Sequence, residues 1–323
     1  IAARLARVPA AVHAVAGLGY VFASKRLRTR LVLRPLVRRL LGKVCNQPGS
    51  AVIVQNSDDL AFIESLPLSP RTPLALIRGS GVDTSRFTQA LRSPPDAGAP
   101  LVVLFVGRLL FDKGIVDFVE TALRCRQEGG SPGMRFLVAG EPDPGNPASV
   151  PLDALRQWKE AGVVEFLGHV EDMAGLLAMA DIVVLPSRAE GAPRSLIEAA
   201  ACGIPLVATD VPGCREVVLD GQNGFLVPLH DIGALVAAVL RLAGDDELRR
   251  RMGESGRRLV LESLDEKIVF ERTVDVYRQL LPGPWEESLS STGPAASSGT
   301  SAHPRGDTAS SAPPTGARAR RAG

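Results

Sequence analysis

Residues 101–106 read Leu-Val-Val-Leu-Phe-Val, and they run directly into Gly107-Arg108-Leu109-Leu110-Phe111-Asp112-Lys113-Gly114. An uninterrupted apolar run of this length predicts a strand buried on both faces. Similar runs recur along the chain, which predicts strands at 101–106, 135–139, 163–167, 181–185, 205–208 and 225–227. Helical spacing of apolar residues between them predicts helices at 115–127, 152–160, 173–179, 193–202, 213–219 and 231–243. Strands that alternate with helices in this way predict an α/β fold with a doubly wound parallel sheet.

The length of 323 residues is enough for about two domains. Residues 1–85 are expected to be part of a first domain of the same kind, with strands at 12–15 and 51–54 and a helix at 31–45 between them. Residues 86–265 are expected to form the second domain, and residues 266–281 a helix that packs back toward the first. Residues 282–323 are rich in Pro, Gly, Ser, Ala and Thr, so we expect a disordered tail that cannot bury enough apolar surface to fold.

Several kinds of site are missing from the sequence. The four cysteines have neither C-x-x-C spacing nor a histidine at ligand distance, which predicts buried free thiols rather than a metal site. No G-x-x-x-x-G-K-[ST] is present, and no G-x-G-x-x-G follows a strand, so neither a P-loop nor a dinucleotide fingerprint is expected. No D-x-D pair occurs either. We therefore expect no metal and no cofactor, and any phosphate on a ligand must be met by side chains and helix ends.

The loop after residues 101–106 is the first candidate site. In an open parallel sheet, ligands bind beyond the carboxyl ends of the strands, where this loop falls. Arg108 offers a planar fork that can hold a phosphate through two bonds, and Lys113 adds a compact positive charge. Gly107 and Gly114 allow the backbone to turn tightly beside a ligand. The alternative is an ordinary solvated loop.

The second candidate site is the stretch from Pro186 to Glu198, which follows the strand at 181–185. Pro193 suits the first position of a helix, whose free N–H groups attract an anion. Glu190 then lies in the loop and Glu198 lies in the helix. Carboxylates accept hydrogen bonds from vicinal hydroxyls. Groups that bind phosphate beside two carboxylates therefore predict a ligand with both phosphates and sugar hydroxyls, which is a sugar nucleotide. The alternative is that Glu190 only favours the helix dipole and Glu198 is a solvated helix residue.

Together, these two stretches resemble a known family. Gly-Arg-x(4)-Lys-Gly, followed by Glu190-x(7)-Glu198 within E-G-x-P-R-S-L-x-E-A-x-A-C-G-x-P, is similar to the retaining nucleotide-sugar glycosyltransferases of family four. Gly17-Leu18-Gly19-Tyr20-Val21-Phe22 and Arg78-Gly79-Ser80-Gly81-Val82-Asp83 resemble the capsule and exopolysaccharide branch of that family. The resemblance covers about residues 10–281 and implies the GT-B fold of two Rossmann-like domains, with the N-terminal one incomplete here.

The resemblance also implies roles for individual residues. Arg108 and Lys113 would bind the donor diphosphate, Glu198 the ribose, and Glu190 the donor sugar, so that Glu190, Arg108 and Lys113 are the expected catalytic residues. The whole set of donor-binding residues implied in this way is Gly107, Arg108, Lys113, His169, Val170, Glu190, Gly191, Ala192, Pro193, Ser195, Leu196 and Glu198. His169 and Val170 would lie near the base, and retention of configuration by front-face substitution is implied as well.

The N-terminal region departs from the family pattern. Many members carry a functional histidine just before the glycines that correspond to Gly17, whereas Ala16 stands here. His13 lies three residues earlier, within an expected strand, where a lone histidine is more often structural. The strand and glycine-rich loop that usually open the family fold would precede Ile1. The resemblance therefore predicts an N-terminally truncated chain whose activity is open.

The N-terminal part of the chain is strongly basic. Residues 1–57 carry ten Lys or Arg and no Asp or Glu, which leaves a formal charge of −8 for the rest against +2 for the whole chain. Within and just after residues 25–43, cations alternate with apolar positions that are expected to share the opposite helix face: Leu33, Leu36, Val37, Leu40, Leu41 and Val44. A basic amphipathic segment can lie on anionic lipid. The alternatives are that the apolar face packs into the first domain, or that the segment is a DNA-binding arm, which lacks any recognition motif.

The expected function is transfer of a hexose or N-acetylhexosamine from a nucleotide sugar, with UDP the expected nucleotide, to a polyprenyl-diphosphate-linked or polysaccharide acceptor. Such a reaction belongs to capsule, exopolysaccharide or O-antigen synthesis. We expect a cytoplasmic protein at the inner face of the plasma membrane, with no nucleic-acid partner. Two alternatives stay open: a nucleotide-sugar epimerase on the same fold, and a non-catalytic fragment that binds a nucleotide sugar.

Overall fold

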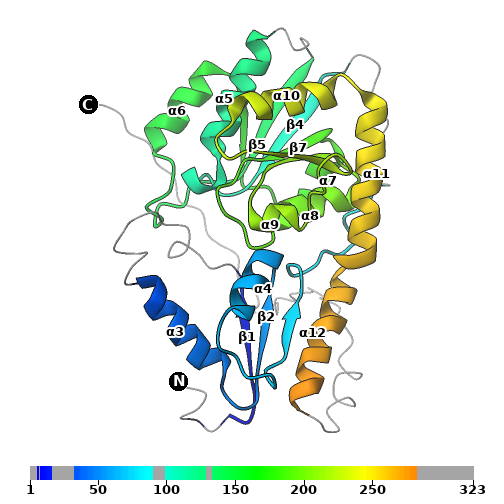
Figure 1. Cartoon of the computed structure of the whole chain (residues 1–323). Coiled ribbons are helices and arrows are strands. Elements are labelled where there is room, and N and C mark those ends of the chain that lie inside the picture. Colours follow the sequence, from blue (N-terminus) through cyan, green and yellow to red (C-terminus); the bar gives the residue numbers. More distant parts are fainter. Residues whose placement is uncertain (1–5, 7, 17–32, 90–98, 129–132, 282–323) are drawn as a thin grey trace, which may run out of the picture. The chain divides into compact units, whose positions relative to one another are not determined.

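The computed structural model describes residues 6, 8–16, 33–89, 99–128 and 133–281. Three predictions lie outside these residues: the first part of the basic segment at 25–32, the Gly17–Phe22 motif and the tail at 282–323. The described chain builds two parallel sheets, one of three strands and one of six (Figure 1).

The first sheet is formed by β1 (Ala11–Val15), β2 (Ser50–Val54) and β3 (Leu74–Leu76), in the order β1-β2-β3. All pairs are parallel, with Val12 opposite Ala51 and Val52 opposite Leu74. Parallel neighbours need a crossover between them. The helix α3 (Arg34–Cys45) joins β1 to β2, and α4 (Ser57–Glu64) lies between β2 and β3.

Alternate residues of β2 serve two separate cores, because successive side chains of a strand point to opposite faces. Val52 and Val54 pack with Cys45 of α3 and Ile63 of α4. On the other face, Ala51, Ile53 and Ile77 pack with Val269 and Val276, which belong to α12 (Glu266–Leu280). The last helix of the described chain thus covers one face of the first sheet (Figure 1).

The second sheet has the strand order β6-β5-β4-β7-β8-β9, all parallel. Its strands are β4 (Leu101–Val106), β5 (Met134–Ala139), β6 (Glu165–Gly168), β7 (Ile182–Leu185), β8 (Leu206–Thr209) and β9 (Gly224–Val227). The chain moves outward from β4 to β6 and then returns to place β7 on the other side of β4. The loops after β4 and β7 therefore leave the same edge of the sheet side by side, at the switch point where open α/β sheets bind ligands.

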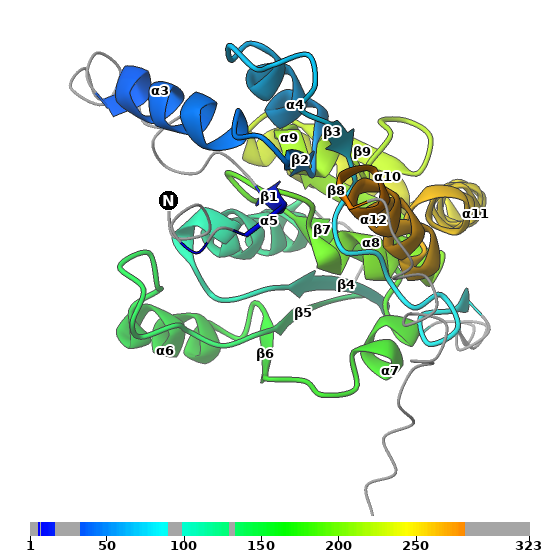
Figure 2. The same cartoon turned by 90° about the horizontal axis from the view of Figure 1, so that it is seen from below.

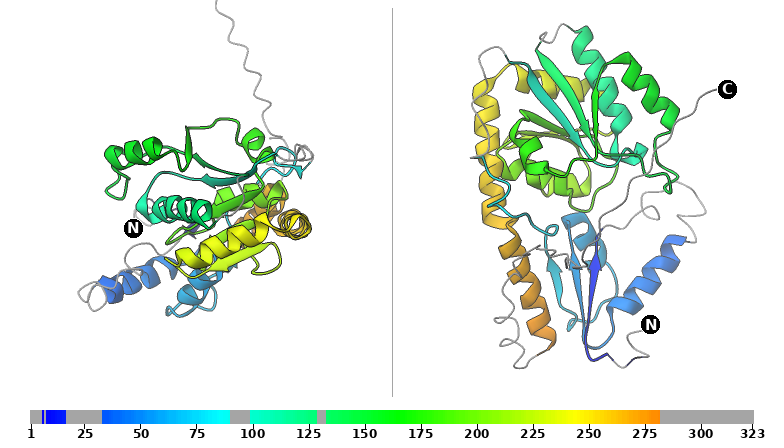
Figure 3. Two further views of the ribbon diagram at one scale, coloured as in Figure 1. Left: turned by 90° about the horizontal axis from the view of Figure 1, so that it is seen from above. Right: turned by 180° about the vertical axis from the view of Figure 1, so that it is seen from behind.

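The helices that cover this sheet are α5 (Ile115–Gln127), α6 (Leu152–Ala161), α7 (Met173–Ala178), α8 (Arg194–Ala201), α9 (Pro212–Arg215), α10 (Ile232–Ala243) and α11 (Asp246–Ser263). Helix α10 packs beside α5, and α11 packs beside α8 (Figures 2 and 3). Phe105, Phe118 and Phe136 form an aromatic group in the core, with ring centroids 5.5 Å and 5.9 Å apart. All four cysteines are buried.

The prediction of an α/β fold with parallel sheets is confirmed. The six expected strands of the second sheet form within one or two residues of the expected bounds. The helix expected at 213–219 is wrong in length, because α9 ends at Arg215. Pro193 is the N-cap rather than the first residue of α8. Four elements were not expected: α4, β3, α11 and a short 3₁₀ helix, Phe111–Lys113.

The expected apolar face of α3 is only partly covered by the first sheet. Leu41 and Cys45 pack into the first core, whereas Leu33, Leu36 and Leu40 are exposed, the last two at 51% and 52%. The apolar positions of this helix span too wide an arc for one sheet face to cover. Within the described part of the chain, no helix combines the length and the apolar character that crossing a bilayer requires.

Candidate active site

The loops after β4 and β7 are bonded to each other. The carbonyl oxygen of Asp112 accepts hydrogen bonds from the N–H of Arg188 at 2.8 Å and from the hydroxyl of Ser187 at 3.0 Å. Gly114, with a φ of 76°, lies so close to the carbonyl of Pro186 that a Cβ would overlap it. Only glycine satisfies both the left-handed backbone and this close approach. The two candidate loops of the sequence therefore form a single structural unit.

Lys113 and Glu190 meet where these loops join. The Nζ atom of Lys113 lies 2.6 Å from Oε1 and 2.8 Å from Oε2 of Glu190. The Glu190 side chain is 7% exposed and that of Lys113 is 26% exposed. An ion pair with both carboxylate oxygens engaged fixes the two side chains in one arrangement. The sequence separation of 77 residues shows that the fold creates this pair.

Arg108 has a different partner. Its Nη1 lies 2.8 Å from Oδ2 of Asp143, and the arginine side chain is 60% exposed. Asp143 belongs to a segment that is tied to the Arg108 loop by backbone bonds, from Val150 N–H to the Leu109 carbonyl and from Phe111 N–H to the Ala148 carbonyl. An exposed pair of this kind contributes little stability. The guanidinium is therefore free to exchange the carboxylate for a ligand phosphate at small cost.

A pocket of about 420 Å³ opens beside Arg108. Four of the predicted donor-binding residues line it: Gly107, Arg108, His169 and Val170. The other lining residues are Val106, Ala139, Gly140, Glu141, Pro142, Asp143, Pro144 and Met173. Its walls come from the carboxyl ends of β4, β5 and β6 and from the start of α7, and Lys113, Glu190 and Glu198 do not line it.

Glu198 is held within its own helix. Its Oε1 accepts a hydrogen bond from Nε of Arg194 at 2.8 Å, one turn earlier on α8. In the part of the chain that the structure describes, no side chain caps the N-terminus of α8, whose first residues include Ser195 and Leu196. The backbone N–H groups at such a helix start favour an anion. The two predicted carboxylates therefore have separate partners: Glu198 is bonded to Arg194, and Glu190 is bonded to Lys113.

The loop that carries Glu190 also contacts α9. A Cβ on Gly213 would lie 2.5 Å from the Gly191 carbonyl oxygen and 2.6 Å from that of Glu190. Cys214, the next residue, is buried, and burial together with the nearby charge of Glu190 raises the pKa of its thiol. Cys214 is therefore a protonated packing residue at the back of the site.

His13 occupies a different place. It lies in the middle of β1, where its ring bonds to the backbone of Val44 in α3, and its Nε2 is buried without a hydrogen-bond partner among the described residues. Burial lowers the pKa of this histidine. A neutral imidazole that faces α3 is a packing residue of the first sheet. The residue that approaches Gly191 from the end of β1 is Ala16, through its carbonyl oxygen, and not His13.

Two residues of the site were not singled out from the sequence. Neither Gly213 nor Asn56 was given a role from the sequence. Asn56-Ser57-Asp58-Asp59 is a helix-start signature, with a capping residue before an acidic first turn. That signal would have indicated α4, which was missed, but it does not indicate that the cap reaches the Glu190 loop. Among the described residues, no group of three His, Cys, Asp or Glu has the arrangement of a metal site.

The two parallel sheets and the switch point beside β4 give an α/β architecture of the GT-B type. Residues 100–245 match the family described as "Glycosyl transferases group 1". Glycogen synthase of Mycobacterium tuberculosis is 32% identical over 200 residues, which are 61% of this chain and 47% of that protein. The chain thus spans about half the length of this relative.

Two further proteins resemble a larger part of the chain. A Campylobacter jejuni protein named N,N'-diacetylbacillosaminyl-diphospho-undecaprenol alpha-1,3-N-acetylgalactosaminyltransferase is 26% identical over 290 residues, which are 87% of this chain and 73% of that protein. The solved structure of HepE from Anabaena, in complex with UDP and glucose, superposes with a TM-score of 0.68 at 18% identity, covering 85% of this chain and 73% of that one.

Proposed function

We propose that the chain transfers a hexose or an N-acetylhexosamine from a UDP-sugar to a polyprenyl-diphosphate-linked or polysaccharide acceptor, with retention of configuration, in capsule, exopolysaccharide or O-antigen synthesis. The observation that carries the proposal is the bonded pair of Lys113 and the buried Glu190 at the switch point of the sheet. The relative from Campylobacter jejuni, named for a diphospho-undecaprenol acceptor, supports the acceptor class. The UDP and glucose bound to HepE support the donor class.

The geometry supports a division of labour among these residues. The base would occupy the pocket beside His169 and Val170. The diphosphate would replace the Asp143 carboxylate as the partner of the Arg108 guanidinium. Glu198 would hold the ribose hydroxyls, and the backbone from Gly191 to Leu196 would line the sugar and phosphate site. Glu190 would bind the donor sugar through oxygens that now accept from Lys113.

In the reaction, the bond from the anomeric carbon to the diphosphate breaks while the acceptor oxygen bonds to the same face of that carbon. The acceptor proton passes to the leaving diphosphate. Lys113 and Arg108 would stabilise the negative charge that develops there, because preorganised cations lower the barrier most where charge appears. These two side chains, with the start of α8, supply the positive charge that a metal ion would otherwise bring, so we propose that no metal or other cofactor takes part.

The test is release of UDP from a panel of UDP-sugars, with and without lipid-linked acceptor. We expect acceptor-dependent release, and we expect Lys113→Ala and Glu190→Ala to lower turnover about 10²-fold or more, as for the loss of one electrostatic donor. The exposed pair Arg135–Glu165 supplies a matched control, since Arg135→Ala also breaks a salt bridge. Conversion of the donor without acceptor would instead indicate an epimerase, and UDP binding without turnover would indicate a binding fragment.

We also propose that the protein acts in the cytoplasm, at the inner face of the plasma membrane, through the basic segment 25–43. Of its described part, α3 exposes Leu36 and Leu40 beside Arg39 and Lys43. Exposed leucines can enter the interface while the cations bind anionic headgroups. Nucleic acid is not among the proposed partners.

Flotation with phosphatidylglycerol and with phosphatidylcholine vesicles tests this docking. Each cation near an anionic surface contributes about 1 kcal/mol, so Arg39→Gln with Lys43→Gln should weaken binding about 30-fold. Arg250→Gln with Arg251→Gln on α11 removes the same charge elsewhere and serves as the control. Equal binding to both kinds of vesicle would contradict electrostatic docking.

A further inference from the structure

The loop Glu190–Pro193 lies against residues that follow the three strands of the first sheet. A Cβ on Gly191 would lie 2.5 Å from the Ala16 carbonyl oxygen, just after β1, and 3.1 Å from the side-chain oxygen of Gln55, just after β2. A Cβ on Gly79, just after β3, would lie 3.1 Å from the Ala192 side chain. All three carboxyl ends of the first sheet therefore touch the loop that positions Glu190.

Asn56 donates a side-chain hydrogen bond to the loop Glu190–Pro193. It follows β2, caps α4 and is 1% exposed. Its side-chain oxygen accepts from the Asp59 N–H at 2.8 Å, and its Nδ2 donates to Oδ2 of Asp59 at 2.9 Å. The same Nδ2 donates to the carbonyl oxygen of Gly191 at 3.3 Å. Asp59 thus fixes which way the amide of Asn56 points, with its N–H groups toward the Glu190 loop.

Capping alone does not require asparagine. Asp and Ser cap helices about as well as Asn, because only a side-chain acceptor is needed. A donor that also reaches a carbonyl oxygen 135 residues away in sequence requires the amide. We propose that Asn56 is a positioning residue that holds the Gly191 carbonyl and so keeps Glu190 in place against Lys113. This inference rests on the proposed function of Glu190.

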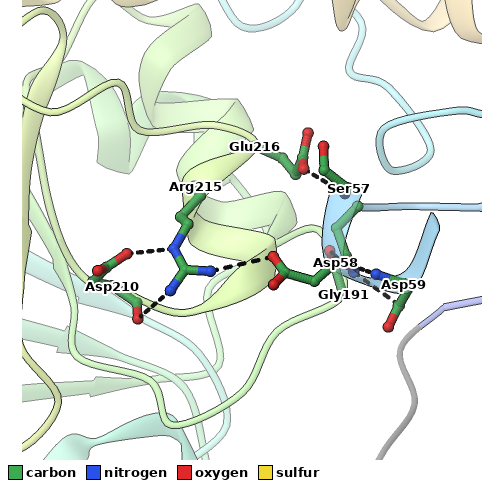
Figure 4. A network of polar contacts seen from close by, with 8 residues as sticks. Ser57, Asp58, Asp59, Gly191, Asp210, Arg215 and Glu216 are labelled. Carbon is green, nitrogen blue, oxygen red and sulfur yellow. Dashed lines mark hydrogen bonds and ion pairs between the residues drawn. The ribbon is translucent and has the colours of Figure 1, made fainter. Parts of the chain in front are cut away.

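The start of α4, which follows Asn56, is itself bonded to α9 and its C-cap (Figure 4). The Glu216 carboxylate accepts from the Ser57 N–H at 2.6 Å and from Arg78. On the adjacent turn, Arg215 bonds to Asp210 at 2.5 Å and to Asp58 at 3.2 Å. These contacts come from α9 and its C-cap, the same short helix whose Gly213 supports the loop from the other side. Asn56 is therefore held at a fixed distance from the loop.

The test compares Asn56→Ser with Asn46→Ser in the full chain. Both asparagines use their side chains on backbone groups, but Asn46 bonds to Ser69 N–H and the Pro67 carbonyl at the end of α3. Hydrogen exchange followed by mass spectrometry reports on each segment. We expect exchange in residues 188–193 to rise at least about 10-fold in Asn56→Ser and to stay at the wild-type rate in Asn46→Ser, with α4 still protected in both.

Activity supplies a second, separate measurement. Because Asn56 is not expected to touch the donor, Asn56→Ser should lower kcat about 10-fold or more while KM for the UDP-sugar changes less than about 3-fold. Asn56→Asp retains shape and cap but turns an oxygen toward the Gly191 carbonyl, so it should loosen residues 188–193 at least as much. Wild-type exchange in residues 188–193 of both variants would overturn the positioning role. Wild-type protein without any transfer would overturn the proposed function instead, and the exchange data would still decide the role of Asn56.

Discussion

Lys113→Met offers a direct measurement of how the site is held together. The substitution retains the length of the side chain and removes its charge. The Glu190 carboxylate, with a side chain 7% exposed, then loses the cation bonded to both of its oxygens. A buried charge without its partner is strongly unfavourable, so we expect the folded state to lose stability.

The size of the loss follows from the exposure of the two groups. Breaking a fully buried ion pair from one side costs about 3–5 kcal/mol. Lys113 is 26% exposed, so water reaches the pair and lowers the expected loss to about 2 kcal/mol. For a domain of this size, that corresponds to a Tm about 4–8 °C lower. Glu190→Gln removes the buried charge instead and leaves the more exposed cation, which should cost about 1 kcal/mol or less.

The double variant Lys113→Met/Glu190→Gln decides between this account and simple loss of packing. With both charges gone, no buried charge is left uncompensated, and we expect stability within about 1 kcal/mol of the wild type. Urea unfolding at pH 7, followed by circular dichroism, gives the free energy of unfolding of the wild type, both single variants and the double variant. A Lys113→Met variant as stable as the wild type, or a double variant no more stable than Lys113→Met, would refute the reasoning.

Two more predictions concern the surroundings of the pair. Gly213→Ala places a Cβ 2.5 Å from the Gly191 carbonyl oxygen and should destabilise the protein by about 1–3 kcal/mol, whereas Gly145→Ala, with its nearest neighbour 3.9 Å away, should melt like the wild type. Glu216 has a lowered pKa: burial alone would raise it, but the bonds from Ser57 and Arg78 outweigh that effect. Its contribution to stability is therefore present above about pH 4.5 and lost as the pH falls through the lower value of the folded state, so urea unfolding of Glu216→Gln from pH 3 to 6 should depend less on pH than that of the wild type.

Much of the second sheet was predictable because its strands are continuous apolar runs and its helices are separated by glycines and prolines. Helix α11 was not predicted, since it combines many charges with Gly253 and Gly256. The glycine at 253 is there because the Gly203 carbonyl leaves no room for a Cβ, a contact that sequence periodicity does not reveal. The short elements α4 and β3 were missed because eight and three residues show too little periodicity.

The sequence placed the candidate side chains at one edge of the sheet, but it did not indicate their partners. It grouped Arg108 with Lys113, and Glu190 with Glu198, by charge. The structure instead bonds Lys113 to Glu190, while Arg108 and Glu198 bond to Asp143 and Arg194. Which cation meets which carboxylate depends on the switch in strand order between β4 and β7, and that order follows from packing of the whole sheet.

The position of α12 bears on how the protein is made. Val269 and Val276 cover the face of the first sheet formed by Ala51, Ile53 and Ile77, and they are among the last described residues to be synthesised. Until they leave the ribosome, that apolar face has no cover, although its strands were translated about 200 residues earlier. During translation the nascent chain therefore exposes this apolar face until α12 is made. We expect a chaperone to bind the first sheet during that time.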